Sequence, residues 1–152
     1  MQAPGHRALR TGRASLAHHV YHLTLTVEDR RSVFHSLVAA RIVVRALNDG
    51  NVIQDTTTLA WCLMPDHLHW LVELGEKLSL SELVQRVKSI STKRLHRAGV
   101  NSGPIWSPAF HDHGLRRDED LATVARYIVA NPVRAGIVKR ASDYPHWDAI
   151  WL

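Results

Sequence analysis

The segment from His67 to Leu74, HLHWLVEL, constrains the fold more than any other part of this 152-residue chain. Apolar and polar side chains alternate along it, which is the pattern of a half-buried β-strand. Every second residue from Leu68 onward is apolar and is expected to face a core. His67 and His69 share the opposite side. The segment therefore predicts a sheet that presents two neighbouring imidazoles on one face.

The other predicted elements follow one another closely along the chain. Apolar positions at helical spacing predict helices, and alternating or β-branched runs predict strands. Ser79 and Glu82 form a capping box that opens the second long helix. The predicted order is strand 20–27, helix 32–49, strand 52–64, strand 67–74, helix 79–98, strand 109–116 and helix 118–131.

This β-α-β-β-α-β order, followed by further helix, is typical of the α+β ferredoxin-like and RRM-like folds. It predicts an antiparallel sheet with helices packed on one face and the other face left available. The length suits one domain, assigned to residues 20–152, behind a basic N-terminal arm over residues 1–19.

Charge is distributed unevenly along the chain. The net charge is +5 and the pI is about 9.9. Residues 83–111 contain no Asp or Glu but carry Arg86, Lys93 and Arg97, which lie close to one line on the second long helix. We expect these three to contact a DNA backbone, although a solvated basic face would have the same composition.

Cysteine and apolar runs indicate the compartment. Cys62 is the only cysteine, so the chain has no disulfide framework. No apolar run approaches the roughly 20 residues that cross a bilayer, and the N-terminus does not resemble a signal peptide. We expect a cytoplasmic protein without a membrane partner.

The two histidines suit a metal ion, because residues i and i+2 of a strand place both imidazoles close enough to bind one ion. Two histidines are not a complete site. An isolated His-x-His is more often a pair of histidines on the wet face of a sheet. A third ligand is therefore needed before the pair indicates a metal centre.

Residues 121–136, LATVARYIVANPVRAG, hold the second informative pattern. Tyr127 and Asn131 are one helical turn apart and lie off the apolar stripe. A phenol attacks a phosphate only when the phosphate is polarised, which Mg²⁺ or Mn²⁺ on the histidines could do, with Asn131 as third protein ligand. Alternatively, Tyr127 packs at the surface, and Asn131 with Pro132 simply starts a helix.

Four segments together resemble a known family. MPDHLHWLVEL, IWSPAFHDHGLRRDEDL, ARYIVANPVRAGIV and DYPHW occur in the order seen in REP-associated tyrosine transposases. These are single-tyrosine transposases of the HUH endonuclease superfamily, and the resemblance runs from about Tyr21 to Trp147. His67-Leu68-His69 matches the motif that gives the superfamily its name.

The resemblance implies a bacterial, metal-dependent single-strand DNA endonuclease and strand transferase acting at hairpin-flanked sites. It assigns the nucleophile to Tyr127, which would form a 5′-phosphotyrosine intermediate, and the Mg²⁺ or Mn²⁺ ligands to His67, His69 and Asn131. It implies no nucleotide cofactor, single-stranded or hairpin DNA as partner, and a monomer or homodimer. Two alternatives stay open: a non-catalytic RRM-like nucleic-acid-binding module, and a phosphodiesterase that uses water.

Further residues are candidates for DNA contact. Trp106, expected on an exposed loop, could stack on an unpaired base or pack in the core. Arg134 either binds phosphate or caps its helix.

Asp112 is placed near the metal or in an ordinary turn contact. His18 departs from the family pattern, because hairpin-reading members often have Gly at that position, three residues before Tyr21.

Overall fold

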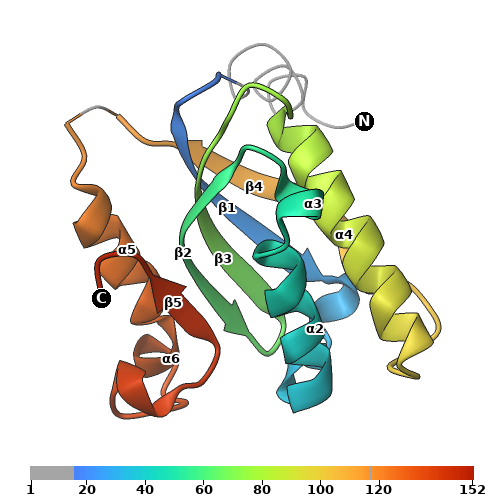
Figure 1. The fold of residues 1–152 in the computed structure, drawn as a ribbon. Coiled ribbons are helices and arrows are strands. Elements are labelled where there is room, and N and C mark those ends of the chain that lie inside the picture. Colours follow the sequence, from blue (N-terminus) through green and yellow to red (C-terminus); the bar gives the residue numbers. More distant parts are fainter. Residues whose placement is uncertain (1–15, 117) are drawn as a thin grey trace.

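A five-stranded antiparallel sheet runs through the middle of the protein in the order β4-β1-β3-β2-β5 (Figure 1). The computed structural model describes residues 16–116 and 118–152. The predicted N-terminal arm, residues 1–19, lies mostly outside these. The strands are β1 (Val20–Val27), β2 (Thr57–Met64), β3 (His67–Glu73), β4 (Trp106–Gly114) and β5 (Trp147–Ala149).

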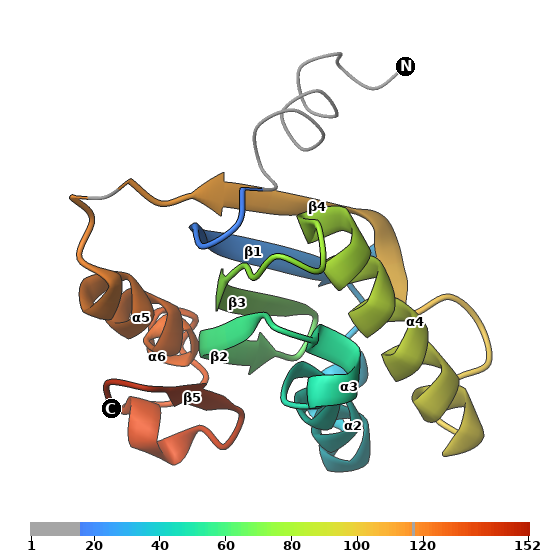
Figure 2. The same cartoon turned by 45° about the horizontal axis from the view of Figure 1, so that its top comes forward.

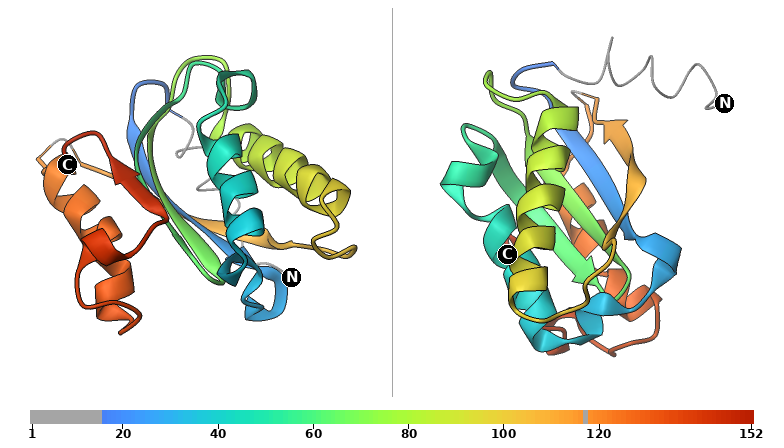
Figure 3. Two further views of the ribbon diagram at one scale, coloured as in Figure 1. Left: turned by 60° about the horizontal axis from the view of Figure 1, so that its bottom comes forward. Right: turned by 90° about the vertical axis from the view of Figure 1, so that its right-hand side faces the viewer.

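Helices cover both faces of this sheet (Figures 1 and 2). On one side lie α2 (Leu37–Leu47), α3 (Gly50–Ile53) and α4 (Leu80–Arg97), and on the other lie α5 (Leu121–Val129) and α6 (Asn131–Arg134). Figure 3 shows the sheet between these two layers. Single 3-10 turns occupy Glu28–Arg30, Val33–His35 and Ala141–Asp143. None of the helices in the described ranges is long and apolar enough to span a membrane.

The predicted α+β architecture is confirmed. The four strands β4-β1-β3-β2 with α2 and α4 on one face form the expected β-α-β-β-α-β arrangement, and β5 extends the sheet beyond β2. Alternation explains the larger core, because Leu68 and Trp70 of β3 face α2 and α4 together with Leu23 of β1. Ser79 caps α4, and the capping box with Glu82 is present.

The second strand was predicted five residues too early. Residues 50–53 form the short helix α3, in which the Asp49 side chain accepts a hydrogen bond from the backbone of Asn51. Gln54 then adopts a φ of 54°, and the strand starts at Thr57. In the sequence, Val52 and Ile53 resemble the start of a strand because both are apolar. In the structure they are buried from a helix instead.

The prediction that one face of the sheet stays available is wrong for half of that face. Ala60, Cys62 and Leu71 lie on it, and they pack against Ala125 and Ile128 of α5. Apolar side chains on β2 and β3 need this cover, since their burial is favourable by about 25 cal/mol per Å². The half nearer β1 and β4 is polar instead, and it holds the histidines described below.

The C-terminal DYPHW segment anchors β5 to the sheet. The Tyr144 hydroxyl is buried and donates to the Leu63 carbonyl of β2. The Leu63 amide donates in turn to the His146 carbonyl, and the Trp147 indole donates to the Ala141 carbonyl. This segment therefore completes the smaller core that supports α5.

Candidate functional site

His67 and His69 lie side by side on the face of β3 that α5 partly covers. Their Nε2 atoms are 3.1 Å apart, and their rings meet edge to face with centroids 4.8 Å apart. Both side chains are half-buried. The alternation of β3 directs them away from the larger core, because Leu68 and Trp70 point into it.

Each histidine has a second partner behind its ring. His67 Nδ1 lies 2.7 Å from Asp66 Oδ1, and His69 Nδ1 lies 3.0 Å from Nε2 of His22 on β1. Burial alone would raise the pKa of Asp66, but hydrogen bonds from His67 and Arg30 outweigh it and lower that pKa. The carboxylate is therefore ionised at neutral pH and suited to hold an N–H of His67.

The environment of His69 disfavours its charged form. Burial is the largest cause, and the neighbouring His67, His22, Arg134 and Arg30 add to it, so the pKa of His69 falls to about 3. Burial and the nearby His113 also lower the pKa of His22. Neutral imidazole is the form that binds a metal ion, so the folded chain keeps His69 ready to act as a ligand.

This depressed pKa predicts acid destabilisation of the metal-free protein. The unfolded chain protonates His69 near pH 6.5, whereas the folded chain does so only near pH 3, so the unfolded state binds more protons between these values. Stability from this group is present above pH 6.5 and is lost as the pH falls. We expect the free energy of unfolding to drop by about 1–2 kcal/mol between pH 7 and pH 5.

Urea unfolding in a chelating buffer at several pH values would measure this slope. The variant His69→Gln should flatten it, and His35→Gln, which changes an exposed histidine away from the sheet, should not. An unchanged slope in His69→Gln would contradict the prediction.

Tyr127 stands at the surface of α5 with its ring held by an arginine. Its side chain is 60% exposed, and the Arg134 guanidinium carbon lies 3.7 Å from the ring centroid. The other two tyrosines, Tyr21 and Tyr144, are 3% and 8% exposed. Of the three phenols in the chain, Tyr127 is therefore the one that a DNA strand could reach.

Arg134 connects this tyrosine to the histidines. Its charge contributes to the lowered pKa of His69 and acts on Cys62, which pairs with His69 across β2 and β3. Among the described residues no carboxylate pairs with Arg134. One face of the guanidinium covers Tyr127, and its edges are free to bind phosphate.

Asn131 begins α6, which packs beside β2 and carries Arg134, whose charge acts on His69. Its Nδ2 donates to the Ile128 carbonyl at 2.9 Å, so the amide oxygen points the other way and can accept or ligate. Asn131 with Pro132 does start a helix, as the alternative interpretation predicted, and Ala130 holds the N-cap position.

The imidazole nitrogens and the amide oxygen together suit a divalent ion that binds both nitrogen and oxygen ligands. Two nitrogens bound about 2.1 Å from one ion at a right angle would be about 3 Å apart, close to the spacing of the two Nε2 atoms. Asp66 behind His67 is the outer partner that metal-binding histidines usually have. Within residues 16–116 and 118–152, no three His, Cys, Asp or Glu side chains form a metal-holding group, so a third protein ligand would have to be an amide such as Asn131.

Comparison with known proteins decides the family. The sequence model described as "Transposase IS200 like" matches residues 15–131, which is most of the chain. This chain belongs to the IS200-like transposase family. The REP-associated tyrosine transposase of Escherichia coli K12 is 33% identical over 88 residues, which are 57% of this chain and 50% of that protein.

The fold of this family member matches a solved relative. A REP-associated tyrosine transposase bound to a REP hairpin aligns with a TM-score of 0.70 and 26% identity, over 89% of this chain and 79% of that one. A Haemophilus influenzae Rd relative is 32% identical over 99 residues, 59% of this chain and 56% of its own length. The resemblance seen in the sequence is confirmed, and the chain spans about half the length of the curated relatives it matches.

More histidines of this IS200-like chain share the face than sequence patterns indicated. Side chains of directly paired residues in neighbouring antiparallel strands point to the same face of the sheet. Thr24 pairs with His69 and with His111, so these three share a face. His22 and its partner His113 point to that same face, because His22 is two residues from Thr24 along β1. The alternation of HDHG at residues 111–114 is the signal that could have found the β4 pair. Asp112 pairs with Leu23 and so faces α2 and α4, which excludes the first of its two proposed places, the one near the metal.

The predicted line of cations on α4 lies in the layer opposite the histidines. Arg86 donates from Nε to the Val52 carbonyl and from Nη2 to the Asn51 carbonyl, both at 2.7 Å, so it holds α3 in place. Its expected role as a DNA contact is therefore not supported. Lys93 and Arg97 are exposed and stay a prediction as DNA contacts, on the far side of the sheet from Tyr127.

The expected exposure of Trp106 is wrong. It begins β4, is 7% exposed, donates from Nε1 to Ser91 Oγ and packs against Phe34. Gly103, Pro104 and Pro108 made the segment resemble a loop, but β4 is an edge strand, where proline is tolerated. A base cannot stack on this buried indole.

Replacing Trp106 with alanine should destabilise the fold rather than weaken DNA binding selectively. Loss of the buried ring should lower the free energy of unfolding by about 3–5 kcal/mol, measured by urea denaturation. Trp151→Ala, at an exposed C-terminal tryptophan, is the matched control and should change stability by less than about 0.5 kcal/mol. Reduced DNA affinity with unchanged stability would restore the stacking role.

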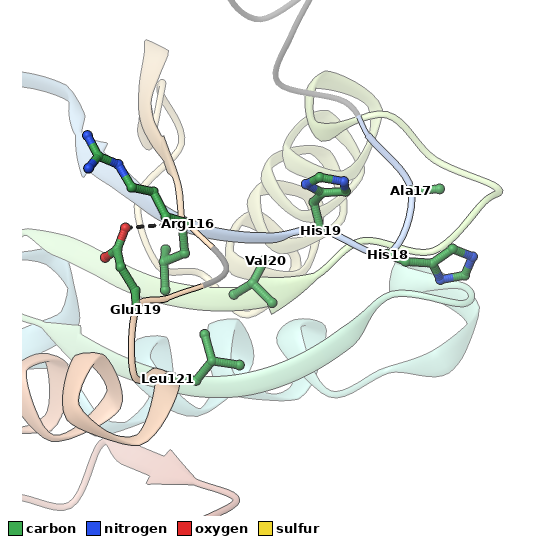
Figure 4. Close-up of a pocket in the computed structure, with 8 residues that line it drawn as sticks. Ala17, His18, His19, Val20, Arg116, Glu119 and Leu121 are labelled. Atoms are coloured by element: carbon green, nitrogen blue, oxygen red, sulfur yellow. Dashed lines mark hydrogen bonds between the residues drawn. The ribbon is translucent and has the colours of Figure 1, made fainter.

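A pocket of 310 Å³ lies where β1 begins and α5 starts (Figure 4). His18 and His19 line one side, and Glu119, which accepts a hydrogen bond from the Arg116 amide, lines the other. His18 has a φ of 63°, the left-handed region that favours glycine. A glycine at this position, as the resemblance implies for hairpin-reading members, would adopt the same backbone conformation at less cost.

Proposed function

We propose that this chain is a metal-dependent single-strand DNA endonuclease and strand transferase that acts at hairpin-flanked sites through a 5′-phosphotyrosine intermediate. One observation carries the proposal. The exposed Tyr127 is stacked on Arg134, and the charge of Arg134 acts on His69, whose Nε2 lies 3.1 Å from Nε2 of His67. A phenol, a cation and two metal-type ligands therefore lie on the same side of the sheet, with the cation linked to both the phenol and one ligand.

Each residue has a distinct role in this proposal. His67, His69 and Asn131 would hold Mg²⁺ or Mn²⁺, which when bound polarises the scissile phosphate. Arg134 binds a phosphate oxygen through the free edges of its guanidinium while its face keeps the phenol ring in place. Tyr127 is the nucleophile, and no nucleotide cofactor is required.

The reaction is an exchange of one phosphodiester for another. The Tyr127 oxygen attacks phosphorus and loses its proton, and the bond from phosphorus to the 3′ oxygen breaks. That oxygen takes up a proton and leaves as a free 3′-OH. The strand is then held by its 5′-phosphate on the tyrosine, and a 3′-OH can reverse the step to join strands.

Hairpin DNA as the partner is supported by the relative solved in complex with a REP hairpin. The net charge of +5 favours a phosphate backbone, and the site residues named here all come from one chain.

Labelling the two ends of the DNA separately would test the proposal. A pool of hairpins with randomised single-stranded flanks is incubated with the protein and Mn²⁺, then denatured and separated on a gel. A strand labelled at its 3′ end should appear as a protein–DNA band, and a strand labelled at its 5′ end should be released as a shorter free fragment. Chelator should remove both products.

The alternatives give different results in the same gel. Shorter fragments without a protein–DNA band would favour a phosphodiesterase that uses water. Intact DNA that is retarded only in a native gel would favour a non-catalytic RRM-like binding module. Either result would overturn the proposed mechanism.

A further inference from the structure

His22 of β1 stands directly behind one of the two candidate metal ligands. Its Nε2 lies 3.0 Å from Nδ1 of His69, and the two ring centroids are 5.2 Å apart. His67 contacts the other ring nitrogen of His69, Nε2. Because the two contacts are at opposite corners of the His69 ring, His22 is placed behind that ligand and not beside the ion.

We propose that His22 is a positioning residue for the metal centre, whose imidazole accepts the Nδ1–H of His69 and so keeps Nε2 of His69 free to bind an ion. This inference rests on the proposed metal-dependent function. Asp66 does the same for His67, with its carboxylate 2.7 Å from Nδ1 of that ring. The two ligands thus have chemically different supports, a carboxylate and a neutral ring.

The 3.1 Å distance between the two Nε2 atoms also requires that the hydrogen bond between His69 and His22 reverse its direction when an ion binds. Without an ion, two Nε2 atoms 3.1 Å apart cannot both present lone pairs, so one must carry a hydrogen. A neutral His67 ring carries one hydrogen, which Asp66 holds on Nδ1, so in that state the hydrogen between the rings belongs to His69 Nε2. His69 Nδ1 is then an acceptor, and His22 donates to it from Nε2.

Ion binding reverses this arrangement without a net change in protons. The hydrogen of His69 moves from Nε2 to Nδ1, and that of His22 moves from Nε2 to Nδ1, so His22 changes from donor to acceptor. The residue at position 22 must therefore be able to do both. An imidazole can both donate and accept by changing its tautomer. A glutamine amide extends about as far from the backbone as Nε2 of a histidine, and it can do both by rotating.

Two amide variants of different length test this requirement. His22→Gln should bind Mn²⁺ within a few-fold of the unmodified protein, whereas the shorter His22→Asn should bind about 10–100-fold more weakly. Free Mn²⁺ counted by electron paramagnetic resonance gives both affinities without any DNA. His113→Asn, at the β4 partner of His22 with no contact to His69 among the described residues, is the control and should bind normally.

Nitrogen-15 NMR of the histidine rings at pH 8, with and without Mg²⁺, gives the spectroscopic signature. In the unmodified protein, the hydrogen of His69 should move from Nε2 to Nδ1 when Mg²⁺ is added. Equal Mn²⁺ affinity in His22→Asn, or a His69 tautomer that does not change, would overturn this inference alone. Failure of the unmodified protein to bind either ion would instead overturn the proposed metal centre.

Discussion

Replacing Tyr127 with phenylalanine should abolish the covalent protein–DNA product and reduce strand cleavage by at least about 10³-fold. The variant lacks the attacking oxygen but keeps the ring on which Arg134 is stacked. Because the side chain is 60% exposed, its hydroxyl supports no core contact. Stability should therefore change by less than about 0.5 kcal/mol, and hairpin binding should persist.

Tyr144→Phe is the matched control, because it removes one hydroxyl from a second tyrosine. That hydroxyl is buried and donates to the Leu63 carbonyl, so its loss should lower the free energy of unfolding by about 1–3 kcal/mol. The covalent product should nevertheless form. A covalent product in Tyr127→Phe that equals the unmodified protein's would show that Tyr127 is not the nucleophile.

Local patterns in the sequence were sufficient for the elements that form the site. Alternation in β3 placed both histidines on the face away from the larger core, since side-chain direction in a strand depends only on position. Helical spacing likewise placed Tyr127 off the buried stripe that contains Ala125 and Ile128. These predictions needed no knowledge of how strands pair.

Features that depend on strand pairing could not be predicted in this way. His22 is 47 residues from His69, and only the register of β1 against β3 makes them neighbours. Trp106 was misplaced because glycine and proline beside it indicate a loop, whereas an edge strand accepts them. Arg86 appeared free in sequence, but it binds the carbonyls of Asn51 and Val52 in α3, a helix whose second half was predicted as strand.

A second large effect is expected when His67 is replaced with alanine. The variant loses one of the two nitrogens that lie 3.1 Å apart, and Asp66 loses the ring that it orients. The Mn²⁺ concentration needed for half-maximal formation of the covalent product should rise by at least about 100-fold. Titrating Mn²⁺ in the gel assay, with free Mn²⁺ counted in parallel, measures this shift.

The same assay distinguishes loss of a ligand from loss of structure. His111→Ala removes an exposed histidine from the same face of the sheet, on β4, and should leave the Mn²⁺ dependence unchanged. Asp66 in the His67→Ala variant still pairs with Arg30 at 3.0 Å, so its carboxylate is not left without a partner and the fold should persist. If His67→Ala needs no more Mn²⁺ than the unmodified protein does, the two imidazoles of β3 are not the metal ligands, because no single remaining ring can reproduce a paired site.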